Sequence, residues 1–186
     1  MTKKTRAQAE TYYRQVRRDA QLAVQAELRE LTHAEIFLTD IGEEALAAAD
    51  TWRELYSAHK ADHVPGWDWR KEVRRIRNRP RRVEVALWHE QTVCGLALGR
   101  ISDRCVIATI HLVEANPAGN PLAGMVVPFI TRYLETLAAS LGCKEVSIEQ
   151  PAEALVEYYE SIGFGKKVMK GQRVIRQKMN LNSRLG

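Results

Sequence analysis

The stretch "EALVEYYESIGF", residues 153–164, holds the residues whose type and spacing most directly suggest chemistry. Its apolar and aromatic positions recur at helical spacing and are Leu155, Tyr158, Tyr159 and Ile162. The glycine that follows stands where a left-handed residue commonly ends a helix. A tyrosine has an apolar ring that packs in a core and a hydroxyl that can donate a hydrogen bond. We therefore expect one of the two adjacent tyrosines to be a core residue and the other to take part in a reaction.

A second unusual stretch is "RKEVRRIRNRPRR", residues 70–82, with eight Lys or Arg and one acid, Glu72. The whole chain has a formal net charge of +5, so this stretch concentrates the positive charge. Such a run is most often a solvated helix face, but its density fits an acidic partner equally well. We expect Val73 and Ile76 to be buried and Arg70–Arg82 to be available to RNA, DNA or an acidic protein.

Composition sets the class of protein. The 186 residues suit one domain with a sizeable core, and 45% hydrophobic with 27% charged residues is ordinary globular usage. The three cysteines are an odd number without C-x-x-C or zinc spacing, which favours buried reduced thiols and no metal site. The first ten residues lack the apolar core of a signal peptide, and no apolar run reaches membrane-spanning length. We expect a soluble cytoplasmic protein without membrane contact.

The positions of apolar residues predict the elements that must position these residues. From about Thr5 to Leu31 there is no proline or glycine, and apolar residues recur every three or four positions, which predicts a long amphipathic helix. This helix either packs on its own domain or pairs with a second copy in a homodimer.

The remaining chain alternates between the two periodicities. We expect the following order: a strand at 35–41, a helix from 43, a loop at 59–69, a basic helix ended by Pro80, a hairpin of strands at 83–87 and 93–101, a central strand at 105–115, a loop at 116–124, a helix at 126–141, a strand at 144–150, the helix of the opening stretch, and two strands around Lys170 and Gly171. The strand at 144–150 should join the central strand by a right-handed parallel crossover. The fold class is therefore mixed α/β.

This order of elements, from about Glu35 to Leu181, resembles the GNAT superfamily of CoA-dependent N-acyltransferases. That family commonly ends its last helix with a tyrosine, three further residues and then Gly-Phe, and Tyr159, Gly163 and Phe164 keep this spacing. The closing "VIRQKMNL" resembles the final strand of the family. The resemblance implies a GNAT-like domain at 35–186, in which helices flank a central mixed β-sheet, and an extra helical extension at 1–34.

The resemblance also implies acetyl-CoA as co-substrate, and the CoA phosphates are a further candidate for the acidic partner of residues 70–82. The family holds the CoA pyrophosphate with backbone N–H groups of an R/Q-x-x-G-x-G/A loop and the helix after it. Here Pro121, Gly124 and Val126 align with the key positions, so only the first glycine is kept. We expect Val126 to leave less room for the backbone to approach the cofactor, and Pro128 to remove one donor. The residues expected to hold the cofactor are Leu112, Val113, Gly119, Asn120, Leu122, Ala123, Gly124, Met125 and Val126.

Aminolysis of a thioester needs an amine without its extra proton, a donor for the oxyanion and a proton for the departing thiolate. By resemblance, backbone N–H groups near residues 112–114 serve the oxyanion and Tyr159 lies by the sulfur, while Tyr158 is a pocket wall. Glu114, at the carboxyl end of the central strand, is the first candidate for the base. His111 is its rival, although strand alternation places it on the opposite face, and Glu149 is a third choice. The ordinary alternatives are a solvated loop acid and a core histidine.

The loop at 59–69 corresponds to a segment that often lines the acceptor site in this superfamily. Its candidate substrate-binding residues are His63, Trp67 and Asp68, together with Tyr158. Trp67 and Trp69 either wall an apolar acceptor pocket or anchor the basic helix on the sheet.

These observations predict an N-acyltransferase that moves an acetyl or short acyl group from CoA to an amine acceptor of unspecified class. The alternative is a catalytically silent GNAT-like module that binds nucleic acid or a protein through its basic helix. The spacing of Tyr159, Gly163 and Phe164 favours the enzyme, whereas the altered pyrophosphate loop favours the silent module.

Overall fold

The computed structural model describes residues 5–59 and 66–181 of the chain. Within these ranges the elements are α1 (Arg6–Thr32), β1 (Ile36–Thr39), α2 (Glu43–His59), α3 (Trp69–Ile76), β2 (Arg82–His89), β3 (Thr92–Ile101), β4 (Ile107–Ala115), α4 (Val126–Ser140), β5 (Glu145–Glu149), the 3-10 turn η1 (Glu153–Leu155), α5 (Val156–Ser161), β6 (Lys166–Lys170) and β7 (Arg173–Asn180). The predicted order of elements is confirmed.

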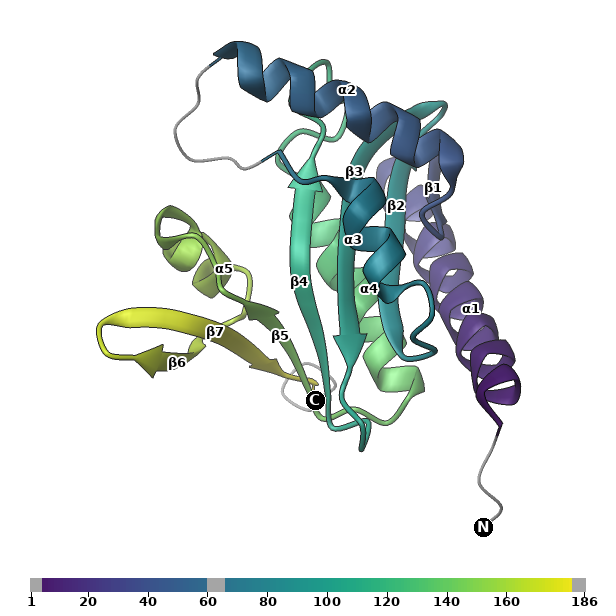
Figure 1. Ribbon diagram of the computed structural model, residues 1–186, viewed down its shortest axis with the longest axis vertical. Coiled ribbons are helices and arrows are strands. Elements are labelled where there is room, and N and C mark those ends of the chain that lie inside the picture. The colour runs from purple at the N-terminus through teal and green to yellow at the C-terminus, as the bar shows by residue number, and fades with distance from the viewer. Residues whose placement is uncertain (1–4, 60–65, 182–186) are drawn as a thin grey trace.

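A single twisted sheet organises the described residues (Figure 1). Its strand order is β1-β2-β3-β4-β5-β7-β6, and neighbouring strands are antiparallel except for β4 and β5. The parallel pair is joined through α4, as the crossover rule predicts. Helices α1 and α4 cover one face of the sheet, and α2 with α3 cover the other, so the core lies in two layers.

Helix α1 packs on its own domain. Ala20, Val24 and Leu28 are buried in the same cluster as the apolar side chains of α4. Thr5 begins the helix with a capping box, in which its side chain accepts from the Gln8 backbone N–H and the Gln8 side chain accepts from the Thr5 backbone N–H. Of the two expectations for this helix, packing within the chain is the one observed.

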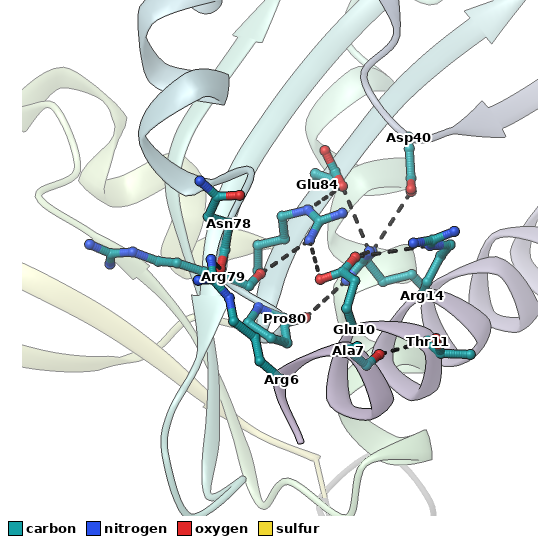
Figure 2. Close-up of polar contacts among 12 residues, drawn as sticks. Arg6, Ala7, Glu10, Thr11, Arg14, Asp40, Asn78, Arg79, Pro80 and Glu84 are labelled. Carbon is teal, nitrogen blue, oxygen red and sulfur yellow. Dashed lines mark hydrogen bonds and ion pairs between the residues drawn. The ribbon is translucent and has the colours of Figure 1, made fainter. Parts of the chain in front are cut away.

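A network of ion pairs joins the first half of α1 to the first residues of β2 (Figure 2). Arg17 is only 1% exposed, and it lies 3.2 Å from Glu10, 3.8 Å from Asp40 and 3.9 Å from Glu84. Arg82 also reaches Glu10, at 2.8 Å. Burial works to raise the pKa of Glu10, but its bonds to the two arginines outweigh this and hold that pKa below the ordinary value. Buried charges are therefore paired rather than isolated.

Two irregularities of β4 shape the sheet where the functional residues lie. Pairing of β4 with β5 ends, among the described residues, at Ile110–Ile148, and beyond it the two strands diverge (Figure 1). We call this point the fork. Between β3 and β4 the register shifts at Leu98/Gly99, so that His111 is an extra residue, a β-bulge. A Cβ at Gly99 would lie 1.8 Å from the carbonyl oxygen of Thr109, which explains the glycine there.

The basic stretch departs from its expected structure. We predicted that its helix continues to Pro80, but α3 ends at Ile76, and the Arg79 N–H bonds to the Ile76 carbonyl in a turn. Residues 70–82 are therefore divided among a helix, a loop and the start of β2. The expected burial of Val73 is confirmed at 3% exposure. No helix among the described residues has the length and apolar content needed to cross a membrane.

Candidate active site

Glu114 stands out among the acidic residues that the structure describes. It lies near the carboxyl end of β4, beyond the fork, and is only 5% exposed. Trp69 of α3 donates its Nε1–H to Oε2 of the carboxylate, whereas the buried Oε1 has no hydrogen-bond partner in the part of the chain that the structure describes. Burial raises the pKa of Glu114 to about 7, although the Trp69 and Trp67 N–H groups oppose this. A carboxyl with that pKa can take a proton at neutral pH.

The loop before α3 positions Glu114. Trp69 is 1% exposed and packs with α2, so it anchors the helix on the sheet, which was one of the two expectations for the tryptophans. Asp68 is the N-cap of α3, accepting from the Lys71 N–H at 3.0 Å, and it also lies 3.7 Å from Arg53. Trp67 is partly buried against the same cluster. The candidate His63 lies outside the described residues.

His111 does not lie on the face opposite Glu114, and strand alternation was the wrong guide. Its Nδ1 pairs with Glu149 of β5. Glu149 lies on the same face of β5 as Ser147, whose hydroxyl bonds to Thr109 at 2.8 Å, away from the core that contains Ile148. The extra residue of the bulge breaks the alternation of β4, because it turns His111 towards the face that carries α3.

Glu149 joins His111 to β7. Arg176 donates to its other oxygen at 2.9 Å. Burial lowers the pKa of His111 further than the charge of Glu149 can restore it. Burial alone would raise the pKa of Glu149, but the bond to Arg176 and the charges of Arg176 and His111 place it below its usual value. The pair therefore holds a neutral imidazole, and in the described ranges no hydrogen bond engages its Nε2, which can accept a proton.

Tyr159 lies on the other face of the sheet. It is 3% exposed and belongs to the buried cluster that includes Ile110 and Ile148, the last pair before the fork. Its ring meets the Phe164 ring edge-on, with centroids 6.3 Å apart, and Gly163 has the positive φ of 114° that lets the chain turn between them. Burial, with a smaller effect of Tyr158, raises the pKa of Tyr159 to about 12. The phenol is therefore protonated at neutral pH.

Tyr158 is more exposed than its neighbour. Its ring centroid lies 5.6 Å from that of Tyr159, and it packs against the edge of the same core. Tyr159, the more buried of the two tyrosines, is therefore the one that keeps the expected spacing to Gly163 and Phe164.

The loop between β4 and α4 is organised by Asn120. Its amide donates to the Cys94 carbonyl at 2.9 Å, and its Oδ1 accepts from the Leu122 N–H at 2.9 Å. The N–H groups of Ala123 and Met125 also bond within the loop, at 3.2 and 2.9 Å. The side chain of Met125 caps none of the N–H groups of α4. The first turn of α4 therefore presents its N–H groups and the positive end of its dipole without a side-chain cap.

Val126 does not obstruct this surface, contrary to our expectation. Its side chain is 2% exposed and points into the core, where a Cβ on Gly95 would lie 2.3 Å from Val126 Cγ1. A glycine in β3 therefore makes room for the valine. Gly124 has φ of 78° and an open front, because an added Cβ would meet no atom within 4 Å. Gly124, the one glycine of the predicted pyrophosphate motif that this sequence keeps, is therefore exposed at the surface of the loop.

Gly124→Glu is expected to abolish binding of acetyl-CoA while the protein stays folded. The new side chain would project from the open front of the loop and place a negative charge where a pyrophosphate would lie. Calorimetric titration with acetyl-CoA measures the effect. Gly142→Glu is the matched control, since Gly142 ends α4 at the opposite end with φ of 71° and equally open surroundings. Equal affinity of the two variants for acetyl-CoA would show that the cofactor binds at another site.

A large cavity lies elsewhere. It measures about 1200 Å³ between α2, β1 and the β2–β3 turn, and it reaches the loop at Asn116 and Ala118. Neither Glu114 nor Tyr159 lines it. The structure thus brings Glu114, His111 and Glu149 to one side of the fork and Tyr159 to the other. Sequence reasoning missed the bond of Trp69 to Glu114 and the bond of Arg176 to Glu149.

Comparisons with known proteins agree in fold rather than in sequence. No family model and no curated protein matches the chain by sequence. Solved structures match over 78% of this chain. They include an acetyltransferase of the GNAT family from Staphylococcus aureus Mu50, with a TM-score of 0.60, 9% identity and 99% of that chain covered. Another is the PaiA N-acetyltransferase from Thermoplasma acidophilum in complex with coenzyme A, with a TM-score of 0.58, 12% identity and 98% covered. A third, the aminoglycoside 6'-N-acetyltransferase from Enterococcus faecium, has a TM-score of 0.55, 14% identity and 97% covered.

Proposed function

We propose that this chain, which has the fold of the GNAT N-acetyltransferases, transfers an acetyl group from acetyl-CoA to an amine. One observation carries the proposal. Beyond Ile110–Ile148 the sheet opens, and the opening has Glu114, with a pKa near 7, on one face and Tyr159 on the other. A base and an acid on opposite faces of one opening suit a reaction between two substrates that enter from opposite sides.

The cofactor would lie on the α4 side. The uncapped first turn of α4 and Gly124 would hold the pyrophosphate, because a helix N-terminus favours anions. The backbone of Leu112 and Val113 lies beyond the last β4–β5 pair, so it would bond to the pantetheine arm and the thioester oxygen. Gly119 and Asn120 would shape the rest of this loop.

The reaction balances with these groups. Glu114 takes a proton as the amine nitrogen bonds to the thioester carbon, and the backbone N–H groups stabilise the oxyanion. The C–S bond then breaks, the amide forms, and the Tyr159 O–H hydrogen-bonds and protonates the departing thiolate. The products are an N-acetyl amine and CoA as its thiol. The phenolate regains its proton from solvent.

The amine acceptor would lie on the α3 side, near Trp67, Asp68 and Glu114. His111 and Glu149 would pass the proton of Glu114 onward along this face. The structural relatives include enzymes named for aminoglycosides, for spermidine and for the alanine of a ribosomal protein, so the acceptor class stays open. Tyr158 and His63 remain proposed contacts of the acceptor. Because all three cysteines are free thiols, we place the reaction in the cytoplasm.

Incubation with acetyl-CoA and a panel of amines tests the proposal. The panel contains spermidine, kanamycin and a peptide with an N-terminal alanine, and CoA release is followed with a thiol reagent and product by mass. We expect CoA release to depend on at least one amine and to give an N-acetyl product. Binding of acetyl-CoA without transfer to any amine, or no binding at all, would favour the silent module that contacts an acidic partner through Arg70–Arg82.

A further inference from the structure

A further cavity, separate from the one beside α2, is lined by arginines. It measures about 530 Å³ and is bounded by the first turns of α1, the α3–β2 loop and the β3–β4 turn. The lining residues used below are Tyr13, Asn78, Arg79, Arg81, Arg100 and Asp103. Three guanidinium groups therefore gather at one hollow.

Two of these arginines are free to bind a ligand. In the part of the chain that the structure describes, no hydrogen bond or ion pair engages the guanidinium of Arg79 or Arg100, and both residues are exposed. Arg81 is held in place, since it donates to the Tyr13 hydroxyl at 2.9 Å and to Asp103 at 3.1 Å. One aspartate therefore faces three arginines, which leaves the cavity with a net positive charge.

The positive surface continues beyond the cavity on both sides. Arg6 of α1 donates to the Asn78 carbonyl at 2.6 Å, which brings a further arginine to the α3–β2 loop (Figure 2). On the other side, Arg74 and Arg77 are exposed at the end of α3, directly before this loop. The cations are all arginines, whose planar fork matches a phosphate better than a lysine does. An elongated polyanion fits this surface better than a single small anion.

Aromatic rings stand beside the arginines. The Tyr13 ring is part of the cavity wall, and the Tyr12 ring lies 5.1 Å from it, centroid to centroid, with Tyr12 42% exposed. Nucleic-acid bases stack on exposed aromatic rings, whereas the carboxylates of an acidic protein gain nothing from them. Sites for single-stranded nucleic acid combine positive side chains, which contact successive phosphates, with aromatic rings on which the bases stack.

We infer that this arginine cavity and its flanks bind single-stranded nucleic acid, with phosphates at Arg79 and Arg100 and a base against Tyr12. This inference does not depend on acetyl transfer, because neither Glu114 nor Tyr159 lines the cavity and its test measures nucleic-acid binding alone.

The test is binding of a fluorescent oligouridine of about 12 nucleotides, which lies within the usual site size for single strands. The change is Arg79→Ala with Arg100→Ala, measured by anisotropy at several salt concentrations. We expect affinity to fall about tenfold or more, and the slope of log affinity against log salt to fall by about 1.4, that is, about 0.7 for each phosphate that an arginine no longer neutralises. The double variant Lys170→Ala with Arg173→Ala removes the same charge from the exposed β6–β7 turn and should keep wild-type affinity.

Substitutions of Tyr12 test whether the bound ligand is a nucleic acid. Tyr12→Ala should weaken oligouridine binding with an unchanged salt slope, and Tyr12→Phe should restore it. Equal oligouridine affinity in the Arg79/Arg100 variant and in the wild type would overturn the inference. So would a polyglutamate of matched charge that binds as tightly as oligouridine, which would indicate an acidic protein, or full displacement by millimolar inorganic phosphate, which would indicate a free anion. Circular dichroism confirms that each variant is folded.

Discussion

Tyr159→Phe is expected to lower kcat by about 100-fold to 10,000-fold while the fold and the affinity for acetyl-CoA stay nearly unchanged. The substitution keeps the ring that packs against Phe164 and removes only the hydroxyl. Because burial keeps the pKa of this phenol at about 12, the group is always in its donating form at neutral pH. Steady-state kinetics on an amine from the panel give kcat, and calorimetry gives the affinity.

Tyr158→Phe is the matched control, because it removes the same atom from the adjacent, more exposed ring. We expect this variant to keep most of its activity. If the two variants lose activity to the same extent, or if Tyr159→Phe keeps the full rate, Tyr159 is a core residue and the thiolate takes its proton from another group.

Glu114→Gln is expected to lower kcat/KM by about 100-fold to 10,000-fold and to change its dependence on pH. In the wild type, kcat/KM should fall about tenfold for each pH unit below about 7, since the protonated carboxyl cannot act as a base. The amide accepts the Trp69 N–H as the carboxylate does but cannot take a proton, so this acidic limb should disappear.

The raised pKa of Glu114 also predicts how this variant changes folding stability. The folded-state pKa of Glu114 is raised by burial, so ionising the carboxyl costs folding stability as pH rises through about 7. Glu114→Gln removes that cost, and its melting temperature at pH 8 should not be below that of the wild type. Glu149→Gln should keep the inflection near pH 7. If instead Glu149→Gln removes the acidic limb and Glu114→Gln keeps it, the His111–Glu149 pair is the base.

A third substitution examines how Glu114 is positioned. Trp69→Phe keeps a ring in the core and removes the N–H that lowers the pKa of Glu114. The inflection of kcat/KM should therefore move above pH 7. A merely structural tryptophan would leave the inflection where it is and change only the melting temperature.

The order of elements could be predicted because apolar periodicity and glycine positions are local signals. The same holds for the turn at Gly163, whose positive φ is available to few other residues. Glu114 could be found because it ends an apolar strand, but its raised pKa could not, since burial depends on how the fold packs other elements on β4, and the bond from Trp69 comes from a residue distant in sequence.

Two of our predictions were wrong for physical reasons that the sequence pattern of one β-strand cannot show. His111 was placed on the wrong face because a bulge depends on the partner strand, here on the close approach of Gly99 to Thr109. Val126 was expected to crowd the cofactor, but the space for its side chain is provided by Gly95 of β3, which is distant in sequence. Both are properties of pairs of residues brought together by the fold.

Binding of acetyl-CoA to the wild-type protein is the measurement closest to the central claim. Isothermal titration up to millimolar ligand should show saturable heat with one site per chain, and acetyl-CoA at about a hundred times its dissociation constant should stabilise the fold by about 2.7 kcal/mol. Saturable binding that Gly124→Glu removes and Gly142→Glu keeps is the predicted result. Absence of heat and of thermal stabilisation at millimolar acetyl-CoA would contradict the account.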